Sequence, residues 1–263
     1  MGNLVPFGNF AQAGNTGQVI SEVFSRLPKD KEINIAFLGY TDLMLNSEEW
    51  ADLGVVENEL ENRQNFEKLT AIHGRQDVTV VPTLSSAVQS LVGGNCQITV
   101  FDFEKVEGNE VEWDFNFPID IKFEQKFDVI FDFGTCEHIF NIAQAFTNIH
   151  KMLNIGGFVY HGGPLCWPNH GFYGYNPTLF YDFYEDNGSE IIELFLQSRV
   201  NGQAVNVTNV SKYDRFNMRT VLQEKPEWLA LEFLVCVLVQ KNLHCKNITF
   251  PIQRKYRDMS TWM

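Results

Sequence analysis

FDVIFDFGTCEHIFNIAQAFTNIHKMLNIGGFVYHGGPLCWPNHG, residues 127–171, is the stretch that decides the fold. It begins with an apolar run interrupted by two aspartates, which is typical of a strand buried on both faces of a parallel sheet. Apolar residues at helical spacing follow over residues 141–153, and the Gly-Gly pair at 156–157 ends that helix. Residues 158–160 form a second buried strand. A strand, helix and strand of these lengths predict one right-handed crossover unit.

Polar side chains are concentrated where these two strands end. In open α/β sheets, ligands bind beyond the carboxyl ends of the strands. We therefore expect the functional site at this edge of the sheet. The candidate residues there are Asp132, Cys136, Glu137, His138, His161, Asn169 and His170.

Other apolar runs along the chain predict the rest of the sheet. We expect strands at 33–38, 97–102, 127–133, 157–161, 190–196 and 231–239, in one mainly parallel sheet whose last strand is antiparallel. A further short strand is expected at 78–81. The alternation of strands with helical segments predicts a single α/β domain over residues 1–263. Two insertions are expected, at about 40–96 and at about 197–230.

Composition excludes several classes of protein. The chain has 263 residues, of which 44% are apolar, and its net charge is −13, from 20 Lys and Arg against 33 Asp and Glu. This charge argues against nucleic acid or an anionic membrane as the main partner. No apolar run reaches the roughly 18 residues of a membrane span, and no secretory signal is apparent at the N-terminus, so we expect a cytoplasmic protein. Five scattered cysteines without a C-x-x-C pair predict neither a zinc knuckle nor a disulfide framework.

The motif DVIFDFGTCEHIFN, residues 128–141, resembles the class I S-adenosylmethionine-dependent methyltransferases. In that family an acidic residue and a histidine follow strand four, as Glu137 and His138 do here. A leucine, two residues and a Gly-Gly pair precede strand five, as in residues 153–157. The segment NHGFYGYNPTLFYDFYEDNG, residues 169–188, looks like a subgroup associated with polysaccharide and sugar modification. The resemblance implies a Rossmann-like, doubly wound, seven-stranded sheet and S-adenosylmethionine as the cofactor.

The resemblance also implies which residues bind the methyl donor. Gly39 would form part of the turn after strand one, Asp102 would hold the ribose hydroxyls and Asp114 would reach the adenine. Asp132 and Glu137 would complete the cofactor site. The family usually has about three glycines in the first turn, because a Cβ there would obstruct the cofactor.

This chain keeps only the first of those glycines, in the sequence Gly39-Tyr-Thr-Asp. Three alternatives follow from this departure. The cofactor lies further out, or Thr41 and Asp42 bind its polar groups, or there is no such cofactor.

Histidine is the side chain best suited to take a hydroxyl proton near neutral pH. We expect His170 to be the catalytic base. His138, His161, Asn169 and Tyr173 are expected to bind the substrate. As an alternative, Asp132, Glu137, His161 and His170 could hold a divalent metal, although their spacing does not require one.

The sequence therefore favours a methyltransferase that acts on a hydroxyl of a small molecule or a carbohydrate. The alternative is a non-catalytic protein of the same fold that binds a ligand or a partner chain. A small-molecule or sugar substrate is expected, with no nucleic-acid or membrane partner. The sequence identifies neither the acceptor nor the oligomeric state, and a homodimer is compatible with it.

Overall fold

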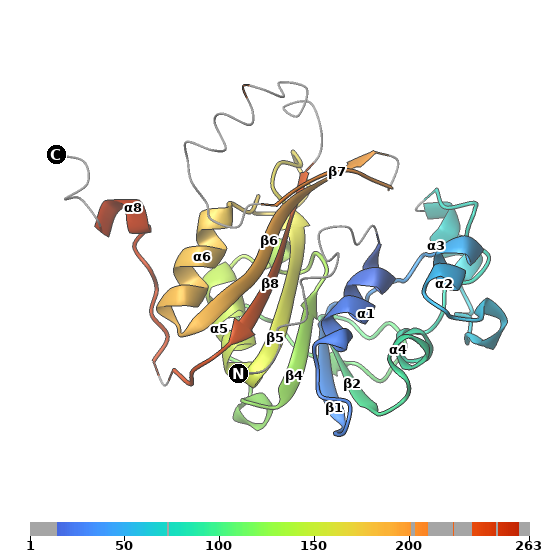
Figure 1. Cartoon of the computed structure of the whole chain (residues 1–263), viewed down its shortest axis with the longest axis horizontal. Helices are drawn as coiled ribbons and strands as arrows, with labels where there is room; N and C mark the ends of the chain where they lie inside the picture. Colours follow the sequence, from blue (N-terminus) through green and yellow to red (C-terminus); the bar gives the residue numbers. More distant parts are fainter. Residues whose placement is uncertain are drawn as a thin grey trace.

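The computed structural model describes residues 15–72, 74–200, 203–209, 223, 233–245 and 247–257. Within these residues one sheet of eight strands runs in the order β3-β2-β1-β4-β5-β8-β6-β7 (Figure 1). The strands are β1 (Ile33–Leu38), β2 (Cys96–Asp102), β3 (Val111–Glu112), β4 (Phe127–Asp132), β5 (Leu153–Pro164), β6 (Ser189–Val200), β7 (Gln203–Asn209) and β8 (Phe233–Lys241).

The directions of the strands confirm the predicted Rossmann-like, doubly wound arrangement. β3, β2, β1, β4 and β5 are parallel to one another. β8, the last strand along the chain, is antiparallel both to β5 and to β6. β7 pairs with β6 as an antiparallel edge strand and adds an eighth strand to the expected seven. Without β7, the order is that of the class I methyltransferase fold.

One predicted strand is wrong. Residues 78–81 do not join the sheet, and Pro82 next to them forms only an isolated bridge with Asn62. Proline has no backbone N–H to donate, so it disfavours a continuing ladder at this position. The predicted insertion at 197–230 lies mostly outside the described residues.

Helices cover both faces of the sheet (Figure 1). The side chains of a strand point alternately to its two faces. In β1, accordingly, Ala36 and Leu38 pack in the cluster that contains α5 (Ile142–Met152) and α6 (Pro177–Asp186). Ile35 and Phe37 face the opposite cluster, which contains α1 (Thr16–Ser25) and α4 (Leu84–Val92). β1 therefore lies between two apolar layers.

Three short helices lie in the segment between β1 and α4. They are α2 (Ser47–Asp52), η2 (Glu57–Glu59) and α3 (Phe66–Ile72). The other helices in the described residues are η3 (Ile121–Phe123), η4 (Cys136–His138) and α8 (Arg254–Arg257). In the described part of the chain, no helix is long and apolar enough to cross a bilayer.

Candidate functional site

A pocket of about 300 Å³ lies at the sheet edge where β4 and β5 end. Its polar lining includes Glu137, His138, His170 and Gln197, and its aromatic lining includes Phe133, Tyr160 and Trp167. Thr16 and Val19 of α1, together with its N-cap residue Asn15, contribute to the wall, and β8 contributes Leu234. The pocket is at the edge where a parallel α/β sheet binds its ligands.

Glu137 is placed by the short helix η4, directly after β4. Gly134, with φ of 94°, turns the chain at the end of the strand, in a backbone conformation that glycine adopts without steric cost. The Glu137 side chain is 1% exposed, and Tyr175 donates a hydrogen bond of 3.4 Å to it. Burial raises the pKa of the Glu137 carboxyl to about 7, and the charge of Asp132 adds to the rise.

His170 reaches the same place from the loop after β5. The backbone N–H of Phe172 donates to the carbonyl of Glu137 at 2.8 Å, so this loop is fixed against η4. A Cβ on Gly171 would lie 2.9 Å from both Cγ and the carbonyl oxygen of Glu137. Glycine at this position therefore permits the close approach of the two segments.

Three of the predicted site residues meet in the pocket. Nε2 of His170 lies 3.7 Å from Oε1 of Glu137, and the rings of His138 and His170 are 5.0 Å apart between centroids. Trp167 packs edge-on against His170, with 4.9 Å between ring centroids. Partial burial, together with the neighbouring His170, lowers the pKa of His138.

Asp132 and His161 do not face the pocket, contrary to our expectation for both. Each side chain is 0% exposed. The ring nitrogens of His161 lie 2.7 Å from Asp132 Oδ2 and 2.5 Å from the hydroxyl of Tyr184. His161 is also stacked on Phe146. Both ring nitrogens are engaged inside the core, so the substrate-binding role expected for His161 does not fit.

Asp132 shapes the loop that carries Glu137. Its carboxylate accepts hydrogen bonds from the backbone N–H groups of Thr135 (3.0 Å) and Cys136 (3.2 Å). Burial alone would raise the pKa of Asp132, but the hydrogen bonds from His161 and this loop outweigh it, and the pKa lies below its usual range. Asp132 is thus placed to support the loop and not to touch a cofactor.

The residues expected to bind the methyl donor are engaged by the chain itself. Oδ2 of Asp102 accepts the backbone N–H of Tyr40 at 2.8 Å, and Oδ1 accepts that of Glu104 at 3.3 Å. Asp114 caps a local turn by accepting the backbone and side-chain N–H groups of Asn116. Neither carboxylate lines the pocket described above.

The space beside Gly39 is filled as well. Gly39 has φ of 75°, and a Cβ there would lie 2.5 Å from the hydroxyl oxygen of Thr135. That hydroxyl donates to the carbonyl of Leu38 at 2.6 Å. The glycine permits the close approach of a threonine of this chain.

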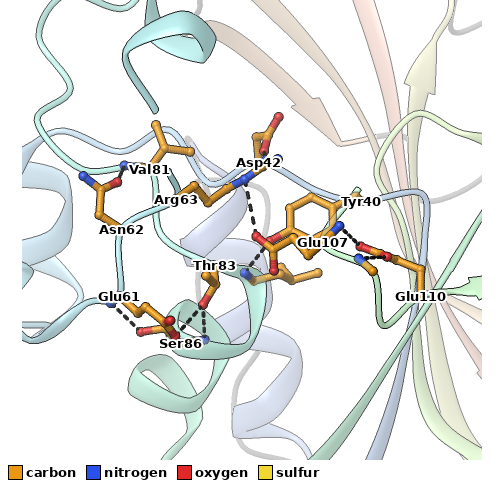
Figure 2. A network of polar contacts seen from close by, with 12 residues as sticks. Tyr40, Asp42, Glu61, Asn62, Arg63, Val81, Thr83, Ser86, Glu107 and Glu110 are labelled. Carbon is orange, nitrogen blue, oxygen red and sulfur yellow. Dashed lines mark hydrogen bonds and ion pairs between the residues drawn. The ribbon is translucent and has the colours of Figure 1, made fainter. Parts of the chain in front are cut away.

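A polar network continues from Tyr40 over the ends of β1 and β2 (Figure 2). The backbone N–H of Leu84, the first residue of α4, donates to the Tyr40 hydroxyl at 2.8 Å. The buried guanidinium of Arg63 lies 4.6 Å above the Tyr40 ring and pairs with Asp42 and with Glu107, the latter at 3.4 Å. A helix N-terminus that could face a bound anion is therefore occupied by this protein's own tyrosine.

As these side chains stand, the residues at the ends of β1 and β2 do not fit S-adenosylmethionine in the place that the resemblance implies. The Thr135 side chain lies against Gly39. The backbone N–H of Tyr40 donates a hydrogen bond to the carboxylate of Asp102, which was expected to bind the ribose.

Two further predicted residues lie near the pocket but outside its lining. Asn169 is exposed, with φ of 62°, and serves the turn before His170. Tyr173 is half-buried and donates to the carbonyl of Phe140 at 2.7 Å. Trp167 and Gln197, which do line the pocket, were not expected from the sequence. The aromatic ring three residues before His170 was a signal for Trp167, whereas nothing in the sequence marks Gln197.

No protein-family model matches the sequence, and no curated protein matches it significantly. The structure is similar to the [4+2]-cyclase SpnF, with a TM-score of 0.44 at 10% identity over 87% of this chain and 81% of that chain. It is similar to the StiE O-MT, residues 961–1257, with a TM-score of 0.43 at 11% identity over 87% and 75% of the two chains. A SAM-dependent methyltransferase from Aquifex aeolicus gives a TM-score of 0.41 at 9% identity over 88% and 93%. Similarities of this size say nothing about the activity of this chain.

Proposed function

We propose that this methyltransferase-fold protein is an enzyme that binds a small hydroxyl-bearing molecule in the pocket at the ends of β4 and β5. The observation that carries the proposal is the convergence of Glu137, His138 and His170 on one side of that pocket. A buried carboxylate and two imidazoles can accept hydrogen bonds from hydroxyl groups and can take a proton from one of them.

The pocket favours a ligand of about the size of one sugar ring. Its volume of about 300 Å³ is at the small end of ligand sites. Trp167 and Tyr160 supply flat apolar surface, and the polar side chains supply hydrogen-bonding groups. An aromatic wall beside polar groups suits a molecule with apolar ring faces and hydroxyl edges.

His170 remains our candidate for the proton acceptor. Its side chain is 38% exposed, so a ligand can reach it, and the Glu137 carboxylate lies 3.7 Å from its Nε2. A carboxylate beside an imidazole orients the ring and stabilises its protonated form. O-methylation of a small-molecule or carbohydrate acceptor is the reaction that the sequence resemblance favours. It requires a methyl donor, and two of the residues expected to bind that donor, Gly39 and Asp102, contact Thr135 and Tyr40 of this chain instead.

Intrinsic fluorescence tests the proposal, because Trp167 lies in the pocket wall. Titration with a panel of monosaccharides should change the emission for at least one of them. The change should be absent in Trp167→Phe and retained in the control Trp113→Phe. His170→Ala should weaken the binding, whereas His244→Ala, which removes an exposed histidine, should not. Equal responses in all four variants would contradict the proposed pocket.

A further inference from the structure

We propose that Glu137, His138 and His170 form a binding site for a divalent transition-metal ion. The metal site does not depend on the proposed function, but the hydroxyl-bearing molecule that would bind to the ion does. It deepens that function, because an ion held by these three side chains would activate the hydroxyl of that molecule.

The residue types fit such an ion. Two imidazole nitrogens and one carboxylate oxygen form a set that Zn²⁺, Fe²⁺ and related ions accept, whereas Mg²⁺ and Ca²⁺ prefer oxygen ligands alone. Three protein ligands also leave coordination positions open for water or a substrate. The open positions would face the pocket, since all three side chains line it.

The geometry is close to that of a formed site. One ligand atom from each residue can be chosen so that the three lie within 4.8 Å of one another. Bond lengths of about 2.0–2.2 Å to a zinc-like ion place neighbouring ligand atoms about 3 Å apart. Nε2 of His170 and Oε1 of Glu137, at 3.7 Å, are already near that separation. Side-chain rotations that move the ligand atoms by about 1 Å would close the site.

The backbone holds the two contributing segments together before any ion binds. Glu137 and His138 belong to η4, whereas His170 comes from the loop after β5. The hydrogen bond from Phe172 N–H to the Glu137 carbonyl and the close approach of Gly171 fix the two segments. The fold therefore brings the two backbone segments together, and the exposed side chains of His138 and His170 extend from them beside the buried Glu137.

The charge around the site also favours a cation. Glu137 is buried, and the carboxylate of Asp132 lies behind it in the core. No lysine or arginine is among the described residues that line the pocket. A divalent ion would supply positive charge next to two buried carboxyl groups, in surroundings where electrostatic attraction is stronger than in water.

A second group, Asp132, Cys136 and His161, has similar spacing but fits less well. All three side chains are buried, and both ring nitrogens of His161 are already engaged. An ion there would have to displace the Tyr184 or the Asp132 contact. The pocket-facing group is therefore the better site.

A bound ion would change how a ligand hydroxyl loses its proton. Coordination to a divalent ion lowers the pKa of a bound water or hydroxyl, so the proton can pass to water near neutral pH. His170 would then hold the ion, and the ion would take over the activation of the hydroxyl.

Cobalt(II) is the probe for this site, because its visible spectrum distinguishes nitrogen and oxygen ligands from sulfur. The experiment uses chelator-treated, untagged protein in a Cys166→Ser background, which removes the exposed thiol. Calorimetry should show one Co²⁺ per chain, with a spectrum free of sulfur-to-metal bands. His138→Ala and His170→Ala should each weaken binding by about 10–100-fold or more, while His244→Ala should bind as the parent does.

Two outcomes would overturn the inference. One is Co²⁺ binding of equal affinity in the parent and in a His138→Ala, His170→Ala double variant whose circular dichroism is native. The other is the absence of Co²⁺ binding to a parent protein that still binds a monosaccharide, which would reject the metal and leave the proposed function intact. Tight Co²⁺ binding at these residues without any hydroxylated ligand would support the metal site and count against the proposed function.

Discussion

Removing the Asp132 carboxylate should cost more stability than any surface change in this chain. In Asp132→Ala, three donors lose their acceptor inside the core: the N–H groups of Thr135 and Cys136 and Nδ1 of His161. Because Asp132 and His161 are both fully buried, water cannot replace the lost contacts. Removing one partner of a buried pair typically costs about 3–5 kcal/mol. We therefore expect the free energy of unfolding to fall by about 4 kcal/mol, a large share of the stability of an ordinary domain.

Urea unfolding followed by circular dichroism measures this change, and the slope with denaturant should stay the same. The matched control is Asp120→Ala. Asp120 caps η3 by accepting the N–H of Lys122, and its ion pair with Lys122 is largely exposed, so water can replace both contacts and their loss should cost far less than that of Asp132. If Asp132→Ala costs no more than Asp120→Ala, the assigned role of the buried carboxylate is wrong.

Three other results are expected. Burial, with a contribution from Lys241, lowers the pKa of His150 to about 4, below its ordinary 6.5. The free energy of unfolding that is linked to neutral His150 is therefore complete above about pH 6.5 and falls by about 3 kcal/mol as the pH approaches 4. In His150→Leu this loss should be smaller, as measured by urea unfolding between about pH 7 and pH 4. An unchanged pH dependence in the variant would contradict the assignment. Gly171→Ala places a Cβ 2.9 Å from Glu137 and should weaken binding in the pocket by about tenfold, so unchanged affinity would show that the loop is not fixed as described. Calorimetry with S-adenosylmethionine at about 1 mM should give no binding heat, and a micromolar dissociation constant would show that the ends of β1 and β2 open to admit it.

Much of the sheet was predictable because buried parallel strands leave a continuous apolar signal. β1, β4 and β8 lie within two residues of the expected ranges. The expected strand at 78–81 failed because a short apolar run carries no information about whether a partner strand lies beside it. The hairpin partner β7 was missed for a related reason, since its alternation lies in a polar segment that resembles a loop.

The site was predictable in position but not in detail. Rules for parallel sheets place the residues after β4 and β5 at one edge, and Glu137, His138 and His170 do meet there. The same rules cannot tell a side chain that faces the pocket from one that faces the core. His161 follows the same strand but is turned inward, toward Asp132 and Tyr184.

The filled space at the ends of β1 and β2 was beyond the reach of sequence patterns. The single Gly39 indicated a departure from the family pattern, but not its form. The network depends on Arg63, from the segment between β1 and α4, meeting Glu107, from the segment after β2. Such a contact between two long connections has no periodicity or spacing that a sequence could reveal.

The most direct test of the central claim is a crystallographic soak with a library of small hydroxyl-bearing molecules, carried out on metal-free crystals and on crystals loaded with Co²⁺. Bound molecules should gather in the pocket, within hydrogen-bonding distance of Glu137, His138 or His170 and against the ring of Trp167. Bound molecules found only elsewhere on the protein, with this pocket empty in both sets of crystals, would contradict the claim that these residues form its functional site.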